Sequence, residues 1–292
     1  MIFTIFTIFT IFSLLQLNIQ SFFNNSIEII NINCNISISF PVSVLIPIYN
    51  KAHYLQRSFG SLKNQTFTKF EIVAVDDCST DSSSEFVLET MKTDSRISFI
   101  QHKYNQGICN SRNHAVLTSR GQYIMSLDPD DAYVNNSIEL AYQSALEYNA
   151  DMLEFRIGAI HRNYTDYNWM NCRISYFQNE VVLTKLQRFR YGNPDIHTCK
   201  KIIRRSVYLK AVNLILPYIK DKRICISEDL LHVGTVLIFA RNYICTQHLV
   251  YLYYRNAPNS SINKGYVTRK QKIATGEYVK QILRYFYRYR KN

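Results

Sequence analysis

The sequence predicts an α/β fold, with a mostly parallel central sheet flanked by helices, from three observations. Short apolar runs alternate with amphipathic segments from residue 42 to residue 155. The connections between them are only a few residues long, which favours neighbouring strands in one sheet. The chain has 292 residues, of which 47% are apolar, so it can bury one large core.

The alternation can be followed along the chain. The first strand is an apolar run bounded by two prolines, and four more apolar runs follow it. The predicted strands are Val42–Ile48, Phe70–Val75, Ile97–Gln101, Tyr123–Leu127 and Asp151–Phe155. The predicted helices, from their apolar periodicity, are Ala52–Leu62, Ser83–Met91, Ile108–Thr118 and Ser137–Glu147. After residue 155 the alternation is lost, and residues 160–200 are expected to be loops that line a binding cleft, with plain irregular structure as an equally consistent interpretation.

Residues 1–23 are a candidate membrane or targeting segment. No charged residue precedes Glu28, and residues 1–17 are largely apolar, with Ile-Phe-Thr repeated three times. That length is marginal for a spanning helix, and the basic n-region of a signal peptide is missing. A signal-anchor, a cleaved signal and a low-complexity tail are the three interpretations. A signal-anchor predicts a membrane-associated protein in the lumen of the endoplasmic reticulum or Golgi, which N-x-S/T sequons would suit.

Charge is divided unevenly between the two halves of the chain. Fifteen acidic residues face ten basic ones through residue 160, whereas 24 basic residues face seven acidic ones after it. An acidic half suits a divalent cation, and a basic half suits phosphates, an anionic acceptor or an anionic membrane surface. Nucleic acid is the competing partner. The seven cysteines include no C-x-x-C pair, so neither a zinc site nor a disulfide framework is indicated.

Two acidic clusters directly follow predicted strands, where ligands bind in open α/β sheets. The first is VDDCSTD, residues 75–81, and the second is LDPDD, residues 127–131. Three carboxylates within the second cluster repel one another unless a cation joins them. Their hard oxygens suit Mg²⁺ or Mn²⁺, with phosphate oxygens completing the coordination. In the first cluster, Asp81 is equally consistent with a helix cap.

Several motifs then recur in a fixed order. Residues 42–81, VSVLIPIYNKAHYLQRSFGSLKNQTFTKFEIVAVDDCSTD, contain P-x-Y-N, N-Q-T and D-D-x-S-x-D elements. Residues 105–131, NQGICNSRNHAVLTSRGQYIMSLDPDD, contain N-x-G, R-N, G-x-Y-I and D-x-D-D elements. In this order and spacing they resemble the family 2 glycosyltransferases of the non-processive type. The resemblance implies a GT-A fold, with a nucleotide-sugar-binding α/β half followed by a variable C-terminal acceptor region.

The resemblance also implies an organisation and a set of donor-binding residues. Composition gives a candidate signal-anchor or signal segment at 1–23 and a stem or linker at 24–40. After them we expect a donor-binding half at 41–158, an acceptor-binding and catalytic half at 159–262, and a basic C-terminal helix at 263–292. The donor-binding residues carried over by position are Pro47, Tyr49, Asp76, Asp77, Arg112 and Asp128. By the resemblance, Pro47 and Tyr49 would border the nucleotide base, and Asp77, with Asp76 beside it, would contact the base or the ribose. Asp130 and Asp128 form the D-x-D element that would hold the divalent cation, Mn²⁺ or Mg²⁺, with Asp130 nearest to it.

A third acidic motif supplies the candidate base. The run CISEDLL, residues 225–231, resembles the E-D motif that the family places at a helix start beneath the acceptor site. Asp229 is therefore the expected catalytic base, and Glu228 is the alternate. The residues alone are as consistent with Ser227 or Asp229 as an ordinary helix cap.

These features predict an inverting transferase that moves one sugar from a nucleotide-diphosphate sugar, UDP-sugar favoured, to a hydroxyl of a glycan, lipid or protein acceptor. The processive synthases' Q-x-x-R-W motif is missing from this chain. A nucleotidyltransferase is disfavoured, because the first strand is not followed by a Gly/Lys/Arg-rich phosphate loop. The remaining alternative is a catalytically degenerate or nucleic-acid-binding module that uses the basic half, although we expect no nucleic acid.

Overall fold

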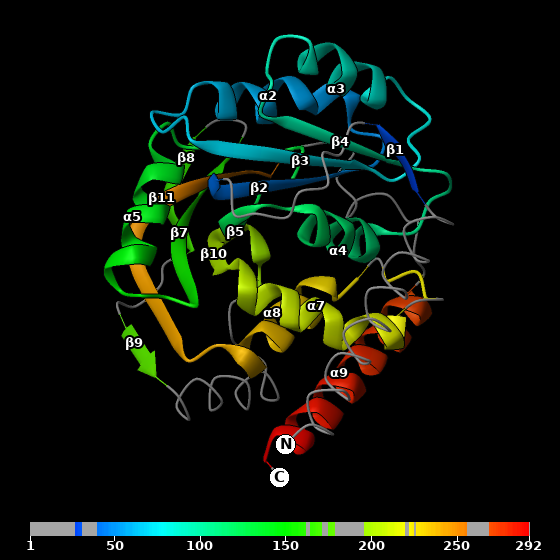
Figure 1. Cartoon of the computed structure of the whole chain (residues 1–292), viewed down its shortest axis with the longest axis vertical. Helices are drawn as coiled ribbons and strands as arrows, with labels where there is room; N and C mark the ends of the chain where they lie inside the picture. The colour runs from blue at the N-terminus through cyan, green and yellow to red at the C-terminus, as the bar shows by residue number, and fades with distance from the viewer. Residues whose placement is uncertain are drawn as a thin grey trace, which may run out of the picture.

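The computed structural model has helices on both faces of one large sheet (Figure 1). It describes residues 27–30, 40–161, 164–170, 175–178, 196–219, 222–224, 226–255 and 269–291. The strands are β1 (Ile27–Ile30), β2 (Phe40–Ile48), β3 (Phe70–Asp76), β4 (Ile97–His102), β5 (Gly121–Ser126), β6 (Ala132–Tyr133), β7 (Met152–Ile160), β8 (Thr165–Met170), β9 (Ser175–Gln178), β10 (Lys201–Arg204) and β11 (Asn242–Tyr254).

The sheet has the order β1-β4-β3-β2-β5-β10-β7-β11-β6, with β8 beside β7 and β9 beside β11. Strands β4, β3, β2 and β5 run parallel to one another, so their carboxyl ends meet at one edge. Strand β10 runs antiparallel between β5 and β7 and joins the two parts of the sheet. The predicted donor and acceptor halves therefore share one continuous sheet.

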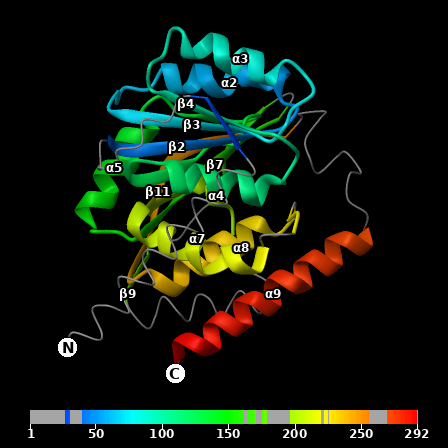
Figure 2. The same cartoon turned by 45° about the vertical axis from the view of Figure 1, so that its right-hand side comes forward.

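The helices form a layer on each face of this sheet. Helices α2 (Ala52–Lys63) and α3 (Ser83–Met91) cover one face, and α4 (Ile108–Thr118), α7 (Arg205–Ile219) and α8 (Glu228–Phe239) cover the other (Figures 1 and 2). Helix α5 (Ser137–Glu147) packs near β7 and β11, and α9 (Arg269–Lys291) packs on the outside of α8. A single 3-10 turn, η2 (Thr198–Lys200), precedes β10.

Burial on both faces explains why the parallel strands are continuous apolar runs rather than alternating ones. Every residue of β3 is buried, and so are residues 42–48 of β2. Close packing also constrains β5 at Gly121, where an added Cβ would lie 2.7 Å from the carbonyl carbon of Val42. Only glycine fits there, because the clash is with the backbone of the neighbouring strand.

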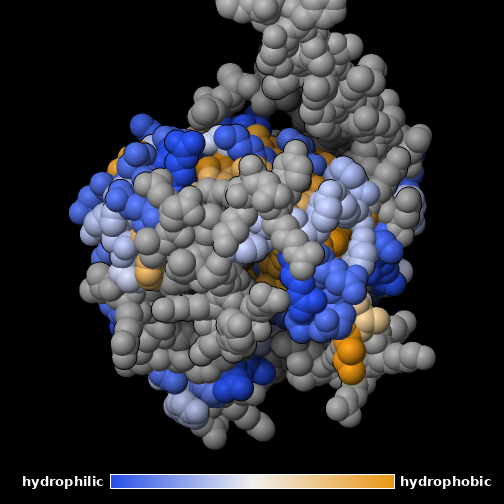
Figure 3. All heavy atoms as spheres, turned by 90° about the horizontal axis from the view of Figure 1, so that it is seen from below, coloured by the Kyte–Doolittle hydropathy of each residue, from blue (hydrophilic) through white to orange (hydrophobic). Residues whose placement is uncertain are grey.

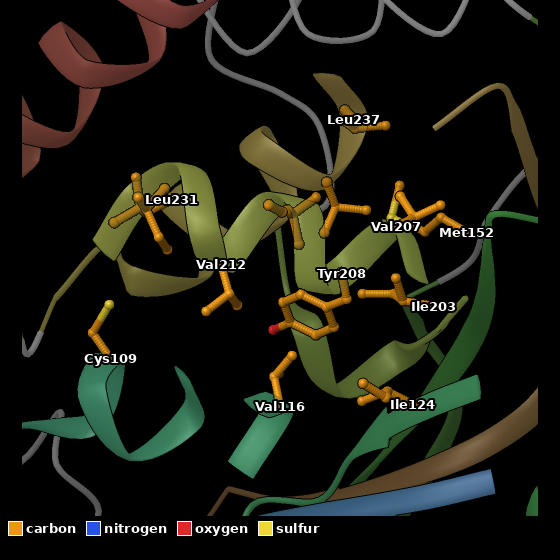
Figure 4. Packing of buried hydrophobic residues seen from close by; sticks show 14 of the residues in the cluster. Cys109, Val116, Ile124, Met152, Ile203, Val207, Tyr208, Val212, Leu231 and Leu237 are labelled. Carbon is orange, nitrogen blue, oxygen red and sulfur yellow. The ribbon is translucent and has the colours of Figure 1, made fainter. Parts of the chain in front are cut away.

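The core beneath the sheet supports the helices that carry several candidate residues. Side chains from α4, β5, β7, β10, α7 and α8 meet around the ring of Tyr208, with Val116, Val212 and Ile203 close by (Figure 4). Tyr208 is fully buried. Complete burial of an aliphatic or aromatic side chain contributes about 1.5–3 kcal/mol, so this packing fixes α4 against α7 and α8.

The predicted α/β class with a mostly parallel sheet is confirmed, and α3, α4 and α5 begin and end where predicted. The expectation of loops throughout residues 160–200 is wrong, because Thr165–Met170 and Ser175–Gln178 form β8 and β9. Each pairs antiparallel with a longer strand, and such pairing stabilises strands whose own sequences show weak periodicity. Within the predicted stem at 24–40, residues 27–30 form β1, which pairs with β4.

Within the described ranges, no helix is long and apolar enough to cross a membrane. The candidate targeting segment at 1–23 lies outside the described residues. Seen from below the sheet, the described surface is mainly hydrophilic, with hydrophobic atoms visible between the charged residues (Figure 3). Helix α9 lies within the predicted basic segment at 263–292, and its Ile273 and Tyr285 are exposed.

Candidate active site

The candidate site is formed where the turns after β2, β3 and β5 meet the starts of α4 and α8. The turns that enter it have unusual backbone conformations. Positive φ angles occur at Asn50 (51°), Cys78 (63°), Gly107 (89°) and Ser227 (64°). Such conformations cost free energy in non-glycine residues and concentrate at functional sites. Several of the predicted site residues lie in or beside these turns.

Asp76, at the end of β3, is buried and holds the first acidic turn together. Its carboxylate accepts hydrogen bonds from the backbone N–H of Ser79 (3.1 Å) and from the hydroxyls of Ser79 and Ser84, the latter at 2.8 Å. Asp81 completes the turn by accepting from the N–H of Ser83 (3.0 Å) and of Ala52 (3.1 Å). Asp81 thus accepts from the first N–H group of α2 and of α3, although the N-cap residue of α3 is Ser82.

Asp77 ties the first acidic turn to the loop before α4. Its two oxygens accept the N–H groups of Gln106 (2.7 Å) and Gly107 (2.8 Å), and His102 Nδ1 lies 2.8 Å away. His102 Nε2 in turn contacts His114 Nδ1 at 2.7 Å. Burial, with the neighbouring His102, lowers the pKa of His114 well below its usual range, so His114 is neutral. Asp77 is 3% exposed, and its predicted contact with the base or ribose of the donor stays a prediction.

Pro47 and Tyr49, predicted to border the nucleotide base, lie in different environments. Pro47 is buried in β2 opposite Val75, whereas Tyr49 is 38% exposed at the strand's carboxyl end. The next residue, Asn50, is fixed by a hydrogen bond from the N–H of Thr80 to its Oδ1 (2.8 Å). Of this predicted pair, Tyr49 alone offers surface to a ligand.

Three carboxylates, those of Asp128, Glu228 and Asp229, surround the guanidinium of Arg112 in α4. Its Nη1 donates to Asp229 (2.8 Å) and lies 3.8 Å from Glu228, and its Nη2 donates to Asp128 (3.3 Å). The guanidinium is buried, but the side chains of Asp128 and Asp229 are 32% and 25% exposed. The structure thus brings one predicted donor-side carboxylate and both predicted base candidates to a single arginine.

The electrostatics of this group follow from burial and from Arg112. Burial lowers the pKa of Arg112, but the three carboxylates, Asp229 first, outweigh it and raise that pKa, so Arg112 stays charged. Burial raises the pKa of Asp128 to about 6 in spite of Arg112. For Asp229, burial acts to raise the pKa, yet Arg112 and a hydrogen bond from Thr198 outweigh burial and hold it below the usual range. Burial and the adjacent Asp229 raise the pKa of Glu228 to about 8.

Asp229 and Glu228 lie in the first turn of α8, where the helix dipole favours negative charge. The preceding Ser227 makes no capping hydrogen bond through its side chain, so the simple cap interpretation does not hold for it. Instead Asp229 turns toward Thr198, whose hydroxyl donates to it at 2.6 Å. Thr198 belongs to η2 and was missed by sequence reasoning, because no motif marks it.

Asp130 and Asp131 of the second acidic turn have separate partners. Lys51 Nζ lies 2.6 Å from Asp130 Oδ2, and Arg57 Nη1 donates to the Asp130 carbonyl oxygen at 2.8 Å. Asp131 is buried and accepts the hydroxyl of Tyr251 (2.7 Å), and burial raises its pKa well above the usual range. Asp131 is therefore an anchor to β11, whereas Asp130 is paired with the ammonium of Lys51.

A divalent cation fits this charge distribution only with help from a ligand. Four carboxyl groups (Asp128, Asp130, Glu228 and Asp229) contact two cationic side chains (Lys51 and Arg112), which leaves an excess of negative charge when all are ionised. Across the described ranges, no three His, Cys, Asp or Glu side chains are gathered closely enough to hold a metal by themselves. Mg²⁺ commonly takes one or two carboxylates and completes its shell with substrate phosphates. Asp130 and Asp128 fit that arrangement.

The sequence model described as glycosyl transferase family 2 matches residues 43–211. The chain is 31% identical over 193 residues to an uncharacterized glycosyltransferase of Haemophilus influenzae, covering 62% of this chain and 57% of that protein. It is 32% identical over 122 residues to the Escherichia coli UDP-Glc:alpha-D-GlcNAc-diphosphoundecaprenol beta-1,3-glucosyltransferase WfgD, covering 42% of this chain and 47% of that protein. The chain spans less than half the length of several other curated relatives.

Solved structures show the same fold. The Staphylococcus aureus protein TarS, residues 1–349 in complex with UDP-GlcNAc, has a TM-score of 0.61 and 21% identity, covering 82% of this chain and 66% of that one. The sheet with its acidic turns at the carboxyl ends of parallel strands is therefore a GT-A fold. With more than half of its length matched by the family model, the chain belongs to glycosyl transferase family 2.

Proposed function

We propose that this protein transfers a single sugar from a nucleotide-diphosphate sugar, with UDP-sugar favoured, to an acceptor hydroxyl with inversion at the anomeric carbon. Family membership supports transferase activity. The UDP-GlcNAc complex of the similarly folded TarS supports a UDP-sugar donor. The activity of WfgD, a glucosyl transfer from UDP-Glc, supports the same class of reaction.

The observation that carries the proposal is the contact of Arg112 with two carboxylates from distant parts of the chain. Asp128 follows β5 on the donor side, and Asp229 begins α8 on the acceptor side. A sugar bound beside this group would have its leaving diphosphate near the Arg112 cation and its acceptor near the Asp229 carboxylate. These are the two kinds of group that the displacement requires.

Asp229 is the better candidate for the general base. Its pKa is held below the usual range, so it is ionised at neutral pH and can accept a proton. Glu228, whose pKa is raised to about 8, keeps its own proton at neutral pH and is the poorer acceptor. A donor diphosphate that attracts Arg112 weakens the Arg112–Asp229 pair, which raises the basicity of Asp229 when the substrate is bound.

The bonds that form and break in the displacement balance as follows. The acceptor oxygen forms a bond to the anomeric carbon as its proton passes to Asp229, and the bond from that carbon to the diphosphate oxygen breaks. A divalent cation, Mn²⁺ or Mg²⁺, held by Asp130 and Asp128 would supply Lewis-acid stabilisation of the departing diphosphate. Arg112 adds a fixed positive charge on the same side. A single displacement of this kind inverts the anomeric centre without a covalent enzyme intermediate.

The proposal also covers the class of acceptor and the location of the protein in the cell. A glycan, lipid or protein hydroxyl would serve the chemistry equally. The apolar residues 1–17 support membrane association through the segment at 1–23. The site contains several acidic side chains, which repel the phosphates of a nucleic acid. Nucleic-acid backbones are bound mainly by Lys and Arg, so we do not propose a nucleic acid as the partner there.

The direct test is thermal stabilisation of the full chain by UDP, GDP, CMP and dTDP, each with Mn²⁺, Mg²⁺ or EDTA. We expect UDP with a divalent cation to raise Tm more than UDP in EDTA, because a ligand that binds only the folded state stabilises it. The matching turnover assay uses UDP-sugars and detects release of UDP. Absence of a shift with every nucleotide and cation would contradict the proposed donor site.

A further inference from the structure

The D-x-D carboxylate expected nearest the cation is already paired with a protein cation. Lys51 Nζ lies 2.6 Å from Asp130 Oδ2, and the two side chains are only 12% and 17% exposed. The two residues are separated by 79 positions in the sequence. A contact this short between poorly exposed opposite charges is stronger than an ion pair in open solvent.

The backbone holds Lys51 in place for this contact. Lys51 directly precedes α2 and follows Asn50, which has a left-handed conformation at φ 51°. The N–H of Lys51 donates to the hydroxyl of Ser83 (3.0 Å), and the N–H of Asn50 donates to that of Ser79 (2.9 Å). Lys51 is thus anchored to the turn after β3, while its ammonium reaches across to the turn after β5.

Other groups near the ammonium keep the turn after β5 in position independently of Lys51. Arg57 donates to the Asp130 carbonyl oxygen rather than to its carboxylate, and its guanidinium lies 3.7 Å from the centre of the Tyr254 ring. Asp131 is held by Tyr251 and by the N–H of Tyr254. Removing the Lys51 ammonium therefore leaves the turn anchored, but removes the cation that the Asp130 carboxylate faces.

An ammonium and a divalent cation compete for the same carboxylate oxygen. Both are positively charged, so they repel each other strongly at the short separation that sharing one carboxylate would require. The cation therefore binds Asp130 well only when the ammonium moves away, and an incoming diphosphate offers the ammonium new oxygen partners. Lysine suits this exchange, because its charge is compact and its stem is flexible.

We propose that Lys51 occupies Asp130 in the donor-free enzyme and moves to the donor diphosphate when the divalent cation binds, so that cation and donor binding depend on each other. This inference rests on the proposed nucleotide-diphosphate donor. Lys51 is a positioning residue in this scheme: it prevents tight cation binding without donor and adds a positive charge beside the diphosphate with it. By linkage, UDP strengthens Mn²⁺ binding by the same factor as Mn²⁺ strengthens UDP binding.

The experiment measures free Mn²⁺ by electron paramagnetic resonance during titration of the full-length protein, with and without UDP. The variants are Lys51→Met, Lys51→Gln and Lys51→Arg. Lys92→Met is the matched control, because Lys92 forms an ion pair of the same length, 2.6 Å, with Glu89 on the exposed surface of α3. Thermal unfolding of each variant checks that it is folded.

We expect Lys51→Met and Lys51→Gln to bind Mn²⁺ in the absence of UDP at least about tenfold more tightly than wild type, since the competing charge is gone. The strengthening of Mn²⁺ binding by UDP should shrink in both. Lys51→Arg, which keeps a charge, and Lys92→Met should behave like wild type. A merely structural role for Lys51 would leave Mn²⁺ affinity unchanged or weaker.

The result that overturns the inference is unchanged or reduced Mn²⁺ affinity in both uncharged Lys51 variants. A separate measurement, UDP binding to the wild-type protein, tests the proposed donor. If UDP fails to bind wild type with Mn²⁺ and also in EDTA, the proposed donor is wrong. Unchanged Mn²⁺ affinity of the variants with normal UDP binding to wild type refutes only the role of Lys51.

Discussion

The acidic turn after β3 and the acidic turn after β5 lie on the same edge of the sheet, yet their carboxylates are neutralised differently. Asp76 and Asp77 accept hydrogen bonds from serine hydroxyls, backbone N–H groups and a histidine ring. Asp128 and Asp130 face the charged side chains of Arg112 and Lys51. In chemical type the two pairs are alike, but their surroundings give them different roles.

The difference indicates which carboxylates can change partners. Backbone N–H donors are fixed by the fold, so Asp76 and Asp77 hold the shape of the turns around them. Cationic side chains can be exchanged for a metal ion or can move to a bound phosphate. The first turn is therefore the frame of the candidate site, and the second is where charge can be rearranged during binding and transfer.

The largest expected effect is on turnover. It tests whether Asp229 is one of the carboxylates that change partners during the reaction. Asp229→Asn should reduce kcat by about a thousandfold, because an amide cannot take up the proton of the acceptor hydroxyl. UDP-sugar binding should stay near the wild-type level, since the proposed cation ligands on the donor side, Asp128 and Asp130, are unchanged. Steady-state kinetics and a donor titration measure the two quantities. Unchanged kcat would remove Asp229 from the chemistry and make Glu228 the candidate base.

A pair of matched substitutions compares the two turns directly. Asp77→Asn should lower the free energy of unfolding by about 2 kcal/mol, because the new amide N–H groups face backbone donors that the carboxylate satisfied. Asp130→Asn should lower the free energy of unfolding by less, since the amide oxygen can still accept a hydrogen bond from Lys51. The same substitution should abolish the metal-dependent stabilisation by UDP. Chemical denaturation and thermal shifts with UDP and Mn²⁺ measure both. Equal losses of stability with retained metal dependence in Asp130→Asn would contradict the distinction.

The smallest expected effect is a pH dependence of stability from Glu228. The pKa of Glu228 is raised from 4.5 to about 8 by folding, so its contribution to stability is complete below about pH 4.5 and is lost as pH rises through 8. Tm of wild type should therefore fall between pH 5 and 8 relative to Glu228→Gln, which cannot ionise. Asp128 also has a raised pKa, to about 6, but it is present in both proteins and cancels in the difference. Parallel Tm curves would show that Glu228 titrates normally.

Local patterns were sufficient for much of the fold and for the identity of most candidate residues. The exact limits of α3, α4 and α5 agree with prediction because their apolar periodicity and flanking turn residues are local signals. Strands β8 and β9 were missed because their stability comes from pairing with β7 and β11 rather than from their own composition.

The amino-acid sequence alone determined the class of fold, the order of its first strands and helices, and the acidic motifs that end them, since each depends on residues close together in the chain. Only the tertiary structure decided which charges meet. Arg112 and Asp229 are 117 positions apart, and Thr198 reaches Asp229 without any motif of its own. Burial then sets the protonation of these groups, because the cost of a buried charge depends on every side chain packed around it.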